Sequence, residues 1–206
     1  MSAYKSPCTA SSAMGGRLVA ACRRAWENGL LAGCNGNMSV RLGANCLISC
    51  SGAAKGHLCE SDLASVRLST GKCKSVRGNA PVPSSELGMH LALYNTRPDI
   101  GAIVHVHPAH LLSLSLRVPQ AEFVRLPLFE AEKLRQRLAF APALPPGSAE
   151  LALAVARAAS TADAIWMQGH GLTCVGPKLN AALALAEELE HLARVQLLAE
   201  RILREA

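Results

Sequence analysis

Aromatic side chains are scarce in this chain: Phe, Trp and Tyr together make up 3% of its 206 residues. Proteins that bind single-stranded nucleic acid usually stack bases on aromatic side chains along a basic groove. The net charge of +6 favours anionic partners, but the Lys and Arg residues are scattered along the sequence. The composition therefore argues against binding of nucleic acid and favours a small phosphorylated ligand.

Long apolar runs are absent as well. No segment approaches the roughly 20 apolar residues that span a bilayer, and residues 1–16 lack the apolar core of a secretory signal. We therefore expect no membrane contact and a soluble, cytoplasmic protein. Half of the residues are hydrophobic, which suffices for one sizeable core but not for two ordinary domains. We expect residues 1–206 to form a single domain.

The eight cysteines show no paired CxxC spacing, which a zinc ribbon or a redox-active pair would require. Disulfides are rare in the cytosol, so we expect buried, reduced thiols.

Three histidines and one glutamate stand out from this background. His105 and His107 lie two apart in a β-branched run, and side chains two apart on a strand point to the same face. His170 lies between two glycines, where the backbone can turn sharply and approach another segment. Glu86 stands near the expected start of a helix. Three imidazoles and a carboxylate suit a catalytic divalent metal that keeps one position open for substrate.

Each of these features also has a purely structural explanation. An isolated HxH in a strand is often incidental, and a histidine in a turn can simply cap a loop. A carboxylate in the first turn of a helix stabilises the positive end of the helix dipole. Taken together, the pattern favours metal ligation by His105, His107 and His170. Glu86 would then be a ligand or the general base that abstracts a proton.

Neutral hydrogen-bond donors accompany this set. Helix starts and glycine-containing turns present free N–H groups to anions. The candidate phosphate-binding residues are Asn37, Ser51, Gly52, Ser84 and Ser85. Serine and asparagine in loops also commonly form turns, which is the alternative role. We expect Lys55 and Arg41 to lie at the solvated surface.

The spacing of apolar residues predicts alternating helices and strands. Helices are expected at 12–28, 84–96, 110–115, 150–160 and 180–205, and strands at 37–41, 45–49, 100–107, 164–168 and 172–175. Residues 117–146 contain several prolines and no clear period, so we expect an irregular segment. On the last helix, Glu190 with Arg194 and Glu200 with Arg204 are expected to form i,i+4 ion pairs.

Several ordered segments resemble the class II aldolase/ribulose-phosphate 4-epimerase (adducin-like) family, in the branch typified by fuculose-1-phosphate aldolase. Residues 36–39 (GNMS) resemble its GN-x-S motif, and residues 48–63 (ISCSGAAKGHLCESDL) resemble its serine-glycine loop. Residues 81–110 resemble the block that joins SSE, a helix and HxH. Residues 168–176 (QGHGLTCVG) resemble the loop of the last histidine ligand.

The resemblance implies an α/β fold, with a three-layer α/β/α arrangement around a mostly antiparallel central sheet. It implies that His105, His107 and His170 hold Zn²⁺, with Mn²⁺ or Co²⁺ as alternatives, and that Glu86 is the acid/base and a further ligand. The phosphate of the substrate would be held by Asn37, Ser51, Gly52, Ser84 and Ser85. A homotetramer with sites near the subunit interfaces is also implied.

The implied activity is cleavage of a ketose 1-phosphate to dihydroxyacetone phosphate and an aldehyde, through an enediolate that Zn²⁺ stabilises. The glutamate after the paired serines favours an aldolase over the epimerases, which typically have aspartate there. Methylthioribulose-phosphate dehydratases generally lack the SSE pattern, and oxo-acid-phosphate decarboxylases often show SKE. A non-catalytic, adducin-like interaction module is disfavoured because all three histidines and Glu86 are retained.

Two features depart from the family pattern. Cys50 replaces the proline that usually precedes the serine-glycine pair, a change that can loosen the phosphate loop. The aldolases usually supply a tyrosine acid from the segment after HxH, whereas Tyr4 and Tyr94 are the only tyrosines here. We expect Tyr94 to pack inside the fold. His110 is a candidate proton donor, with packing near the metal as its alternative role.

Overall fold

The computed structural model describes residues 10–73 and 81–205, with side chains over 13–73 and 81–199. The strands are β1 (Asn37–Leu42), β2 (Asn45–Ser49), β3 (Leu63–Arg67), β4 (Ala102–Val106), β5 (Leu138–Ala141), β6 (Ala164–Met167) and β7 (Gly171–Gly176). The α-helices are α1 (Ala10–Glu27), α2 (Leu87–Thr96), α3 (Ala109–Ser115), α4 (Phe129–Arg135), α5 (Ala149–Ala158) and α6 (Leu179–Glu205). Short 3-10 helices cover Lys55–His57, Glu60–Asp62 and Gln120–Glu122.

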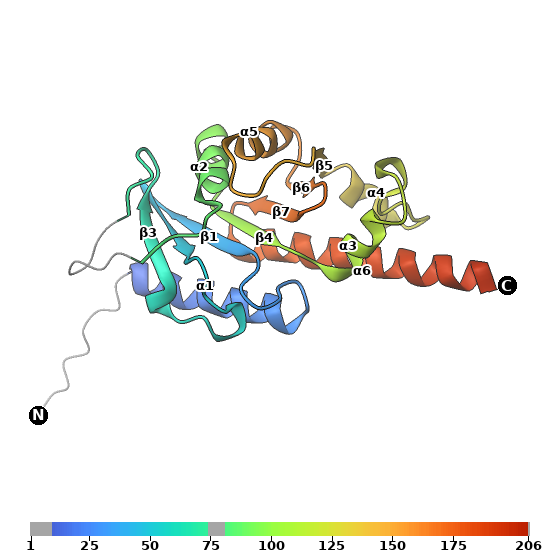
Figure 1. Ribbon diagram of the computed structural model, residues 1–206, viewed down its shortest axis with the longest axis horizontal. Coiled ribbons are helices and arrows are strands. Elements are labelled where there is room, and N and C mark those ends of the chain that lie inside the picture. The colour runs from blue at the N-terminus through green and yellow to red at the C-terminus, as the bar shows by residue number, and fades with distance from the viewer. Residues whose placement is uncertain (1–9, 74–80, 206) are drawn as a thin grey trace, which may run out of the picture.

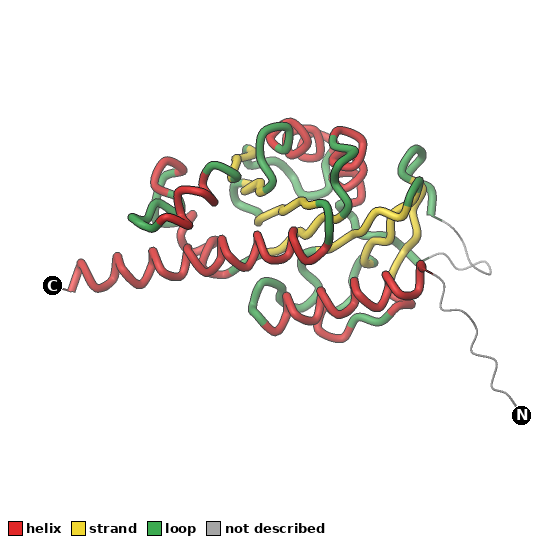
Figure 2. Tube along the Cα trace, turned by 180° about the vertical axis from the view of Figure 1, so that it is seen from behind, coloured by secondary structure: helices red, strands yellow, loops and turns green. Residues whose placement is uncertain are grey.

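The strands form one seven-stranded sheet in the order β3-β2-β1-β4-β7-β6-β5. Neighbouring strands run antiparallel, apart from β5 and β6, which run parallel. Helices α2 and α5 cover one face of the sheet, and α1 and α6 cover the other (Figure 1, and from behind in Figure 2). The predicted three-layer α/β/α arrangement with a mostly antiparallel sheet is therefore confirmed.

Strand β4 lies at the centre of the sheet and sends alternate side chains into the two layers of the core. Val104 and Val106 pack in the cluster that contains α1 and α6, whereas Ile103 packs in the cluster that contains α2 and α5. His105 is two residues after Ile103 and therefore points toward α2. The strand period thus places this imidazole on the face where the segment before α2 arrives.

Residues 117–146 are more regular than their proline content indicates, so the prediction of an irregular segment is wrong. The segment contains α4, which buries Ala131 and Leu134, and β5, which extends the sheet beside β6. The prolines lie toward the two ends of the segment and leave residues 128–141 free of them. Within that stretch every backbone N–H is available, so a helix and a strand can form.

The carboxylate of Glu190 caps a neighbouring helix instead of pairing with Arg194 as predicted. Its Oε1 accepts the backbone N–H of His110 at 2.9 Å, and its Oε2 accepts that of Leu111 at 2.9 Å. Pro108, which precedes α3, offers no side-chain cap, so Glu190 on α6 satisfies these N–H groups. The predicted pair of Glu200 and Arg204 lies outside the described side chains.

The thiols of the described residues are all free, and Cys22, Cys46, Cys50 and Cys174 are buried as expected. Cys34 and Cys59 are exposed, which the prediction of buried thiols did not include. Cys8 lies outside the described residues. None of the helices in the described part combines the length and apolar character of a bilayer span.

Candidate metal centre

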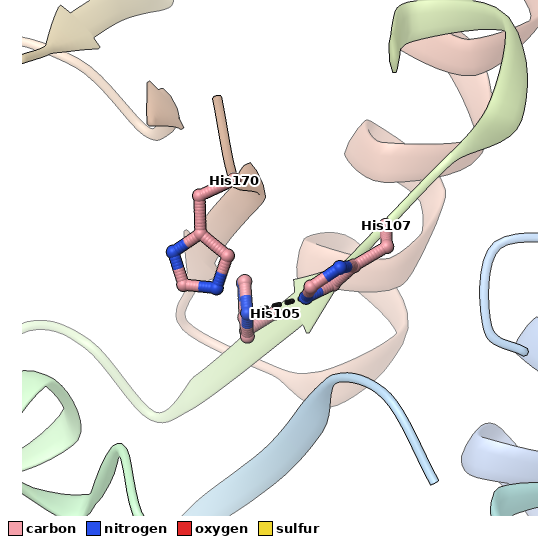
Figure 3. Close-up of side chains that lie close together, drawn as sticks. All are labelled: His105, His107 and His170. Atoms are coloured by element: carbon pink, nitrogen blue, oxygen red, sulfur yellow. Dashed lines mark hydrogen bonds between the residues drawn. The ribbon is translucent and has the colours of Figure 1, made fainter. Parts of the chain in front are cut away.

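The three histidines predicted as ligands converge at one end of the sheet. His105 lies on β4, His107 directly follows that strand, and His170 lies in the turn between β6 and β7. Because β4 pairs with β7, this turn is held beside the end of β4. The ring centroids are 4.8 to 5.1 Å apart, and one nitrogen from each ring lies within 4.8 Å of the others. Figure 3 shows the three rings facing a common space.

The two glycines beside His170 have different structural roles. Gly169 has a φ of +69°, a left-handed conformation that side chains rarely adopt. A Cβ on Gly171 would lie 2.6 Å from the carbonyl oxygen of Val106, so only glycine allows β7 to approach β4 this closely. Both features bring His170 toward the HxH pair.

Glu86 completes the cluster from the start of α2. Its Oε2 lies 2.9 Å from Nε2 of His105, and its Oε1 lies 3.5 Å from Nε2 of His170. The helix begins at Leu87, and Glu86 occupies the capping position without capping the helix through its side chain. The Oγ of Ser84 accepts the backbone N–H of Glu86. The carboxylate is therefore free to face the histidines.

The contacts of His105 require a positive charge inside the cluster. Its Nδ1 lies 3.1 Å from the carbonyl oxygen of Leu172, which only accepts, so Nδ1 carries the proton. The Nε2 of a neutral ring then presents a lone pair, yet it faces the Glu86 carboxylate at 2.9 Å and Nε2 of His107 at 3.1 Å. Lone pairs at these distances repel one another unless a proton or a metal ion lies between them.

The protonation states favour a metal ion. Burial, followed by the charges of neighbouring histidines, lowers the pKa of His107 to about 4 and lowers that of His170. Burial raises the pKa of Glu86, but its contacts with His105, His170 and Asn37 outweigh this effect and lower the pKa to about 2. At neutral pH these rings are neutral and the glutamate is ionised, as metal ligands must be.

Two buried atoms of the cluster have no hydrogen-bond partner among the described residues. They are Oε1 of Glu86 and Nδ1 of His170. Buried polar atoms are nearly always satisfied, so unpaired ones beside three imidazoles are what a metal-binding cluster presents. The residues present therefore fit a divalent cation held by nitrogen and oxygen donors.

The predicted phosphate-binding segments lie side by side. Ser51 donates its N–H to the carbonyl oxygen of Val82 at 3.0 Å, and Ser84 donates its own to Ser49 at 3.2 Å. Ser85 and Gly52 are exposed, and neither N–H donates to another backbone group within the described residues. The two segments therefore present free N–H groups close to the start of α2.

Asn37 forms a hydrogen bond with the carboxylate of Glu86. Its Nδ2 donates to Oε2 of Glu86 at 3.0 Å, and its Oδ1 contacts Nε2 of His90. His90 and Ser39, which contact each other, are fully buried and were not recognised from the sequence. His90 follows Glu86 by four residues, so the i,i+4 spacing was the signal that both point the same way.

The surface position expected for Lys55 is wrong, whereas Arg41 is partly exposed. Lys55 is 1% exposed, and its ammonium donates to the carbonyl oxygens of Cys34 at 3.1 Å and Ala53 at 2.7 Å. Arg41 donates to two backbone carbonyls, and its guanidinium covers the ring of Tyr94. Both cations bind backbone carbonyls of other segments. The residues next to them in the sequence do not reveal these partners.

Cys50 strengthens the loop that it was expected to loosen. It is buried, and its N–H donates to the carbonyl oxygen of Asp62 at 2.9 Å, a bond that proline cannot make. Tyr94 is buried as expected, with its hydroxyl 2.8 Å from Oγ of Ser39. His110 contacts Glu190 through Nδ1 at 2.8 Å. Tyr4 lies outside the described residues.

Comparisons with known proteins agree with this geometry. The profile of the class II aldolase and adducin N-terminal domain matches residues 16–197. L-fuculose phosphate aldolase of Methanococcus maripaludis is 32% identical over 176 residues, 84% of this chain and 91% of that protein. Methylthioribulose-1-phosphate dehydratase of Sodalis glossinidius is 35% identical over 188 residues, which cover 85% of this chain and 91% of that protein. The crystal structure of L-fuculose-1-phosphate aldolase from Thermus thermophilus is 29% identical, with a TM-score of 0.76 over 93% of this chain and 97% of that one.

Proposed function

The chain belongs to the class II aldolase and adducin N-terminal domain family, and from this membership we propose that it is a Zn²⁺-dependent lyase that cleaves a ketose 1-phosphate. The products would be dihydroxyacetone phosphate and an aldehyde. The observation that carries the proposal is the convergence of three imidazoles and an ionised glutamate on one space. A non-catalytic interaction module has no need of such a costly buried cluster.

The metal would be held by His105, His107 and His170, with Glu86 as a further ligand in the absence of substrate. When bound, the cation supplies positive charge that offsets the electrons released as the carbon–carbon bond breaks. Mn²⁺ or Co²⁺ would fit the same donors, since imidazole and carboxylate serve several divalent ions.

Glu86 has the features of the group that moves the C3 proton. One of its oxygens, Oε2, is fixed by His105 and Asn37, whereas Oε1 is buried without a hydrogen-bond partner among the described residues. The fixed oxygen orients the carboxylate, and the unpaired oxygen is free to give or take a proton. In cleavage the C4 hydroxyl loses its proton and becomes the aldehyde, and the electron pair of the C3–C4 bond passes to C3. Oε1, after taking up a proton, would deliver it to C3 of the three-carbon fragment.

The phosphate would be bound by Asn37, Ser51, Gly52, Ser84 and Ser85. Support comes from the adjacent loops, which present free N–H groups at Gly52 and Ser85, and from hydroxyls on the serines. Neutral donors of this kind bind a phosphate without adding a competing cation near the metal.

Replacing Lys55 with methionine is expected to raise the KM for the phosphorylated substrate about tenfold, with a smaller change in kcat. The ammonium holds the carbonyl of Ala53, which follows Gly52, to that of Cys34. Without these two hydrogen bonds, the loop that contains Ser51 and Gly52 holds its N–H groups less rigidly. Steady-state kinetics and the inhibition constant of inorganic phosphate measure the effect, with exposed Lys72→Met as the control. Equal KM values in both variants would contradict the assignment of this loop to phosphate.

Dehydration of a ketose 1-phosphate is the second candidate, because a methylthioribulose-1-phosphate dehydratase is similar to this chain over most of its length. Both reactions place negative charge on the carbon next to the carbonyl and move a proton at C3: the dehydratase removes one there, and the aldolase delivers one there after cleavage. They differ in the bond that breaks: an aldolase breaks C3–C4, and a dehydratase expels the C4 hydroxyl. The paired serines before Glu86 favour the aldolase.

A screen of ketose 1-phosphates tests the proposal. We expect wild-type protein loaded with Zn²⁺ to release dihydroxyacetone phosphate from at least one of them, detected by coupled reduction to glycerol 3-phosphate. Release of water with all carbons retained, measured by mass spectrometry, would establish the dehydratase instead. Metal-free protein without either activity would support the interaction module. The homotetramer and the cytoplasmic location stay predictions.

A further inference from the structure

A continuous chain of buried hydrogen bonds leads from Glu86 into the core. Asn37 Nδ2 contacts Oε2 of Glu86 at 3.0 Å, and Asn37 Oδ1 contacts Nε2 of His90 at 2.5 Å. Nδ1 of His90 contacts Oγ of Ser39 at 2.7 Å, and that Oγ contacts the hydroxyl of Tyr94 at 2.8 Å. All five residues are buried, so water does not compete for these groups. None of the last three residues belongs to the proposed ligand or phosphate sets.

The chemistry of the groups fixes the direction of every bond in this chain. The ionised carboxylate of Glu86 only accepts, so the amide nitrogen of Asn37 must face it. The amide oxygen then faces His90 and also only accepts, so Nε2 of His90 must carry a proton. Burial lowers the pKa of His90 to about 3, which keeps the ring neutral and leaves Nδ1 as an acceptor. Ser39 therefore donates to Nδ1 and accepts from Tyr94.

The orientation of the Asn37 amide is set jointly by the Glu86 carboxylate and by the Nε2–H of His90. If the amide turned over, its oxygen would face the Glu86 carboxylate, and its NH₂ group would face the N–H of His90. Both contacts would then be repulsive in a buried site, where water cannot compensate. A ring with the proton on Nδ1 would remove half of this penalty, with the hydroxyls of Ser39 and Tyr94 reversing the direction of their hydrogen bonds, but the amide oxygen would still face the Glu86 carboxylate.

We propose that His90 is a positioning residue that holds the Asn37 amide with its N–H groups toward Glu86, so that Oε2 is fixed and Oε1 is left for proton transfer. The second N–H of Asn37 then points away from His90 and remains for a substrate oxygen. The ring of His90 hydrogen-bonds neither to the substrate nor to the side chain of a metal ligand in this scheme. The catalytic consequence rests on the proposed lyase function, whereas the tautomer and the amide orientation do not.

Nuclear magnetic resonance of metal-free protein labelled with ¹⁵N-histidine tests the arrangement without substrate. We expect the His90 signals, assigned by their loss in His90→Gln, to report a neutral ring protonated at Nε2, with a slowly exchanging N–H proton. A neutral ring protonated at Nδ1 would overturn the proposal. So would an Nε2 proton that exchanges as fast as that of exposed His57. Because no activity is measured, this result stands even if the wild-type protein cleaves no ketose phosphate.

Two substitutions of His90 separate positioning from packing. Glutamine can place an N–H near the position of Nε2, whereas phenylalanine keeps the ring volume without a donor. We expect His90→Phe to lower kcat about 10- to 100-fold with KM changed less than threefold, and His90→Gln to restore most of the loss. Equal kcat values in the two variants would overturn the proposal, since a packing role predicts no rescue by glutamine. Melting temperature and metal content identify a variant that has lost its fold.

Tyr94→Phe is the matched control for this pair. It removes a buried hydroxyl from the far end of the same hydrogen-bond chain and leaves His90, Asn37 and Glu86 in place. We expect its kcat to stay within about threefold of wild type, although its stability falls. A loss of kcat as large as that of His90→Phe would overturn the proposal, because it would show that any defect in the chain has the same effect.

Discussion

Glu86→Gln is expected to lower kcat for cleavage by about two to four orders of magnitude, the usual contribution of a general acid/base. Glutamine has the same shape but cannot accept and return the C3 proton. Its amide also places an N–H group or an uncharged oxygen where Oε2 accepts from Asn37 and contacts His105. The measurements are kcat for release of dihydroxyacetone phosphate and the rate at which solvent deuterium enters that product at C3.

The deuterium exchange separates loss of the base from loss of the metal. A variant that retains its metal, measured by elemental analysis, and loses exchange has lost the proton carrier. Glu187→Gln is the matched control, because Glu187 forms a surface ion pair with Arg24 and should leave both rates unchanged. If Glu86→Gln cleaves substrate as fast as wild type, Glu86 is not part of the mechanism.

The parts of the site that follow a local period were predictable. The alternation of a β-strand places His105 on the α2 side of β4, and the glycines around His170 indicate a sharp turn near another backbone. The helix that follows Glu86 begins within a few residues of its expected start because serines and a proline precede an apolar stripe. Local chemistry decides each of these features, so the sequence alone reveals them.

The features that depend on distant pairing were not predictable. From the sequence, Lys55 is indistinguishable from a surface lysine. In the fold, the carbonyl of Cys34, 21 residues away, accepts a hydrogen bond from its ammonium. Glu190 reads as half of an i,i+4 pair until α6 crosses the start of α3, 80 residues earlier. In both cases a charged group exchanges solvent for buried backbone partners, and only the tertiary structure supplies those partners.

The hydrogen-bond chain that starts at Glu86 was also not predictable from the sequence, because it depends on the pairing of distant strands. Asn37 reaches the cluster because β1 pairs with β4, which sets Asn37 opposite His105. The sequence resemblance assigned Asn37 to the phosphate site. In the structure, its side chain also donates a hydrogen bond to the carboxylate of Glu86. In the proposed arrangement, the Asn37 amide would serve both groups through its two N–H bonds, held in the orientation that Glu86 and His90 set.

Removal of the metal is expected to abolish catalysis and to lower thermal stability. We expect the purified protein to contain about one divalent ion per chain. The imidazole nitrogens and the carboxylate oxygens of Glu86 lie 2.9 to 3.5 Å from one another, so loss of the cation leaves their lone pairs in direct opposition. Dialysis against a chelator should therefore lower the melting temperature, and Zn²⁺ should restore both the melting temperature and the activity.

His107→Gln is the most informative ligand variant. His107 is the only one of the three that lies outside a strand or tight turn, so its replacement disturbs the backbone least. We expect its metal content after dialysis to fall well below that of wild type and its kcat to fall by at least two orders of magnitude. His57→Gln, at an exposed histidine, should keep the metal content and the kcat of wild type. Full activity of metal-free wild-type protein would exclude a metal-dependent reaction, because the imidazoles and Glu86 would then be sufficient on their own.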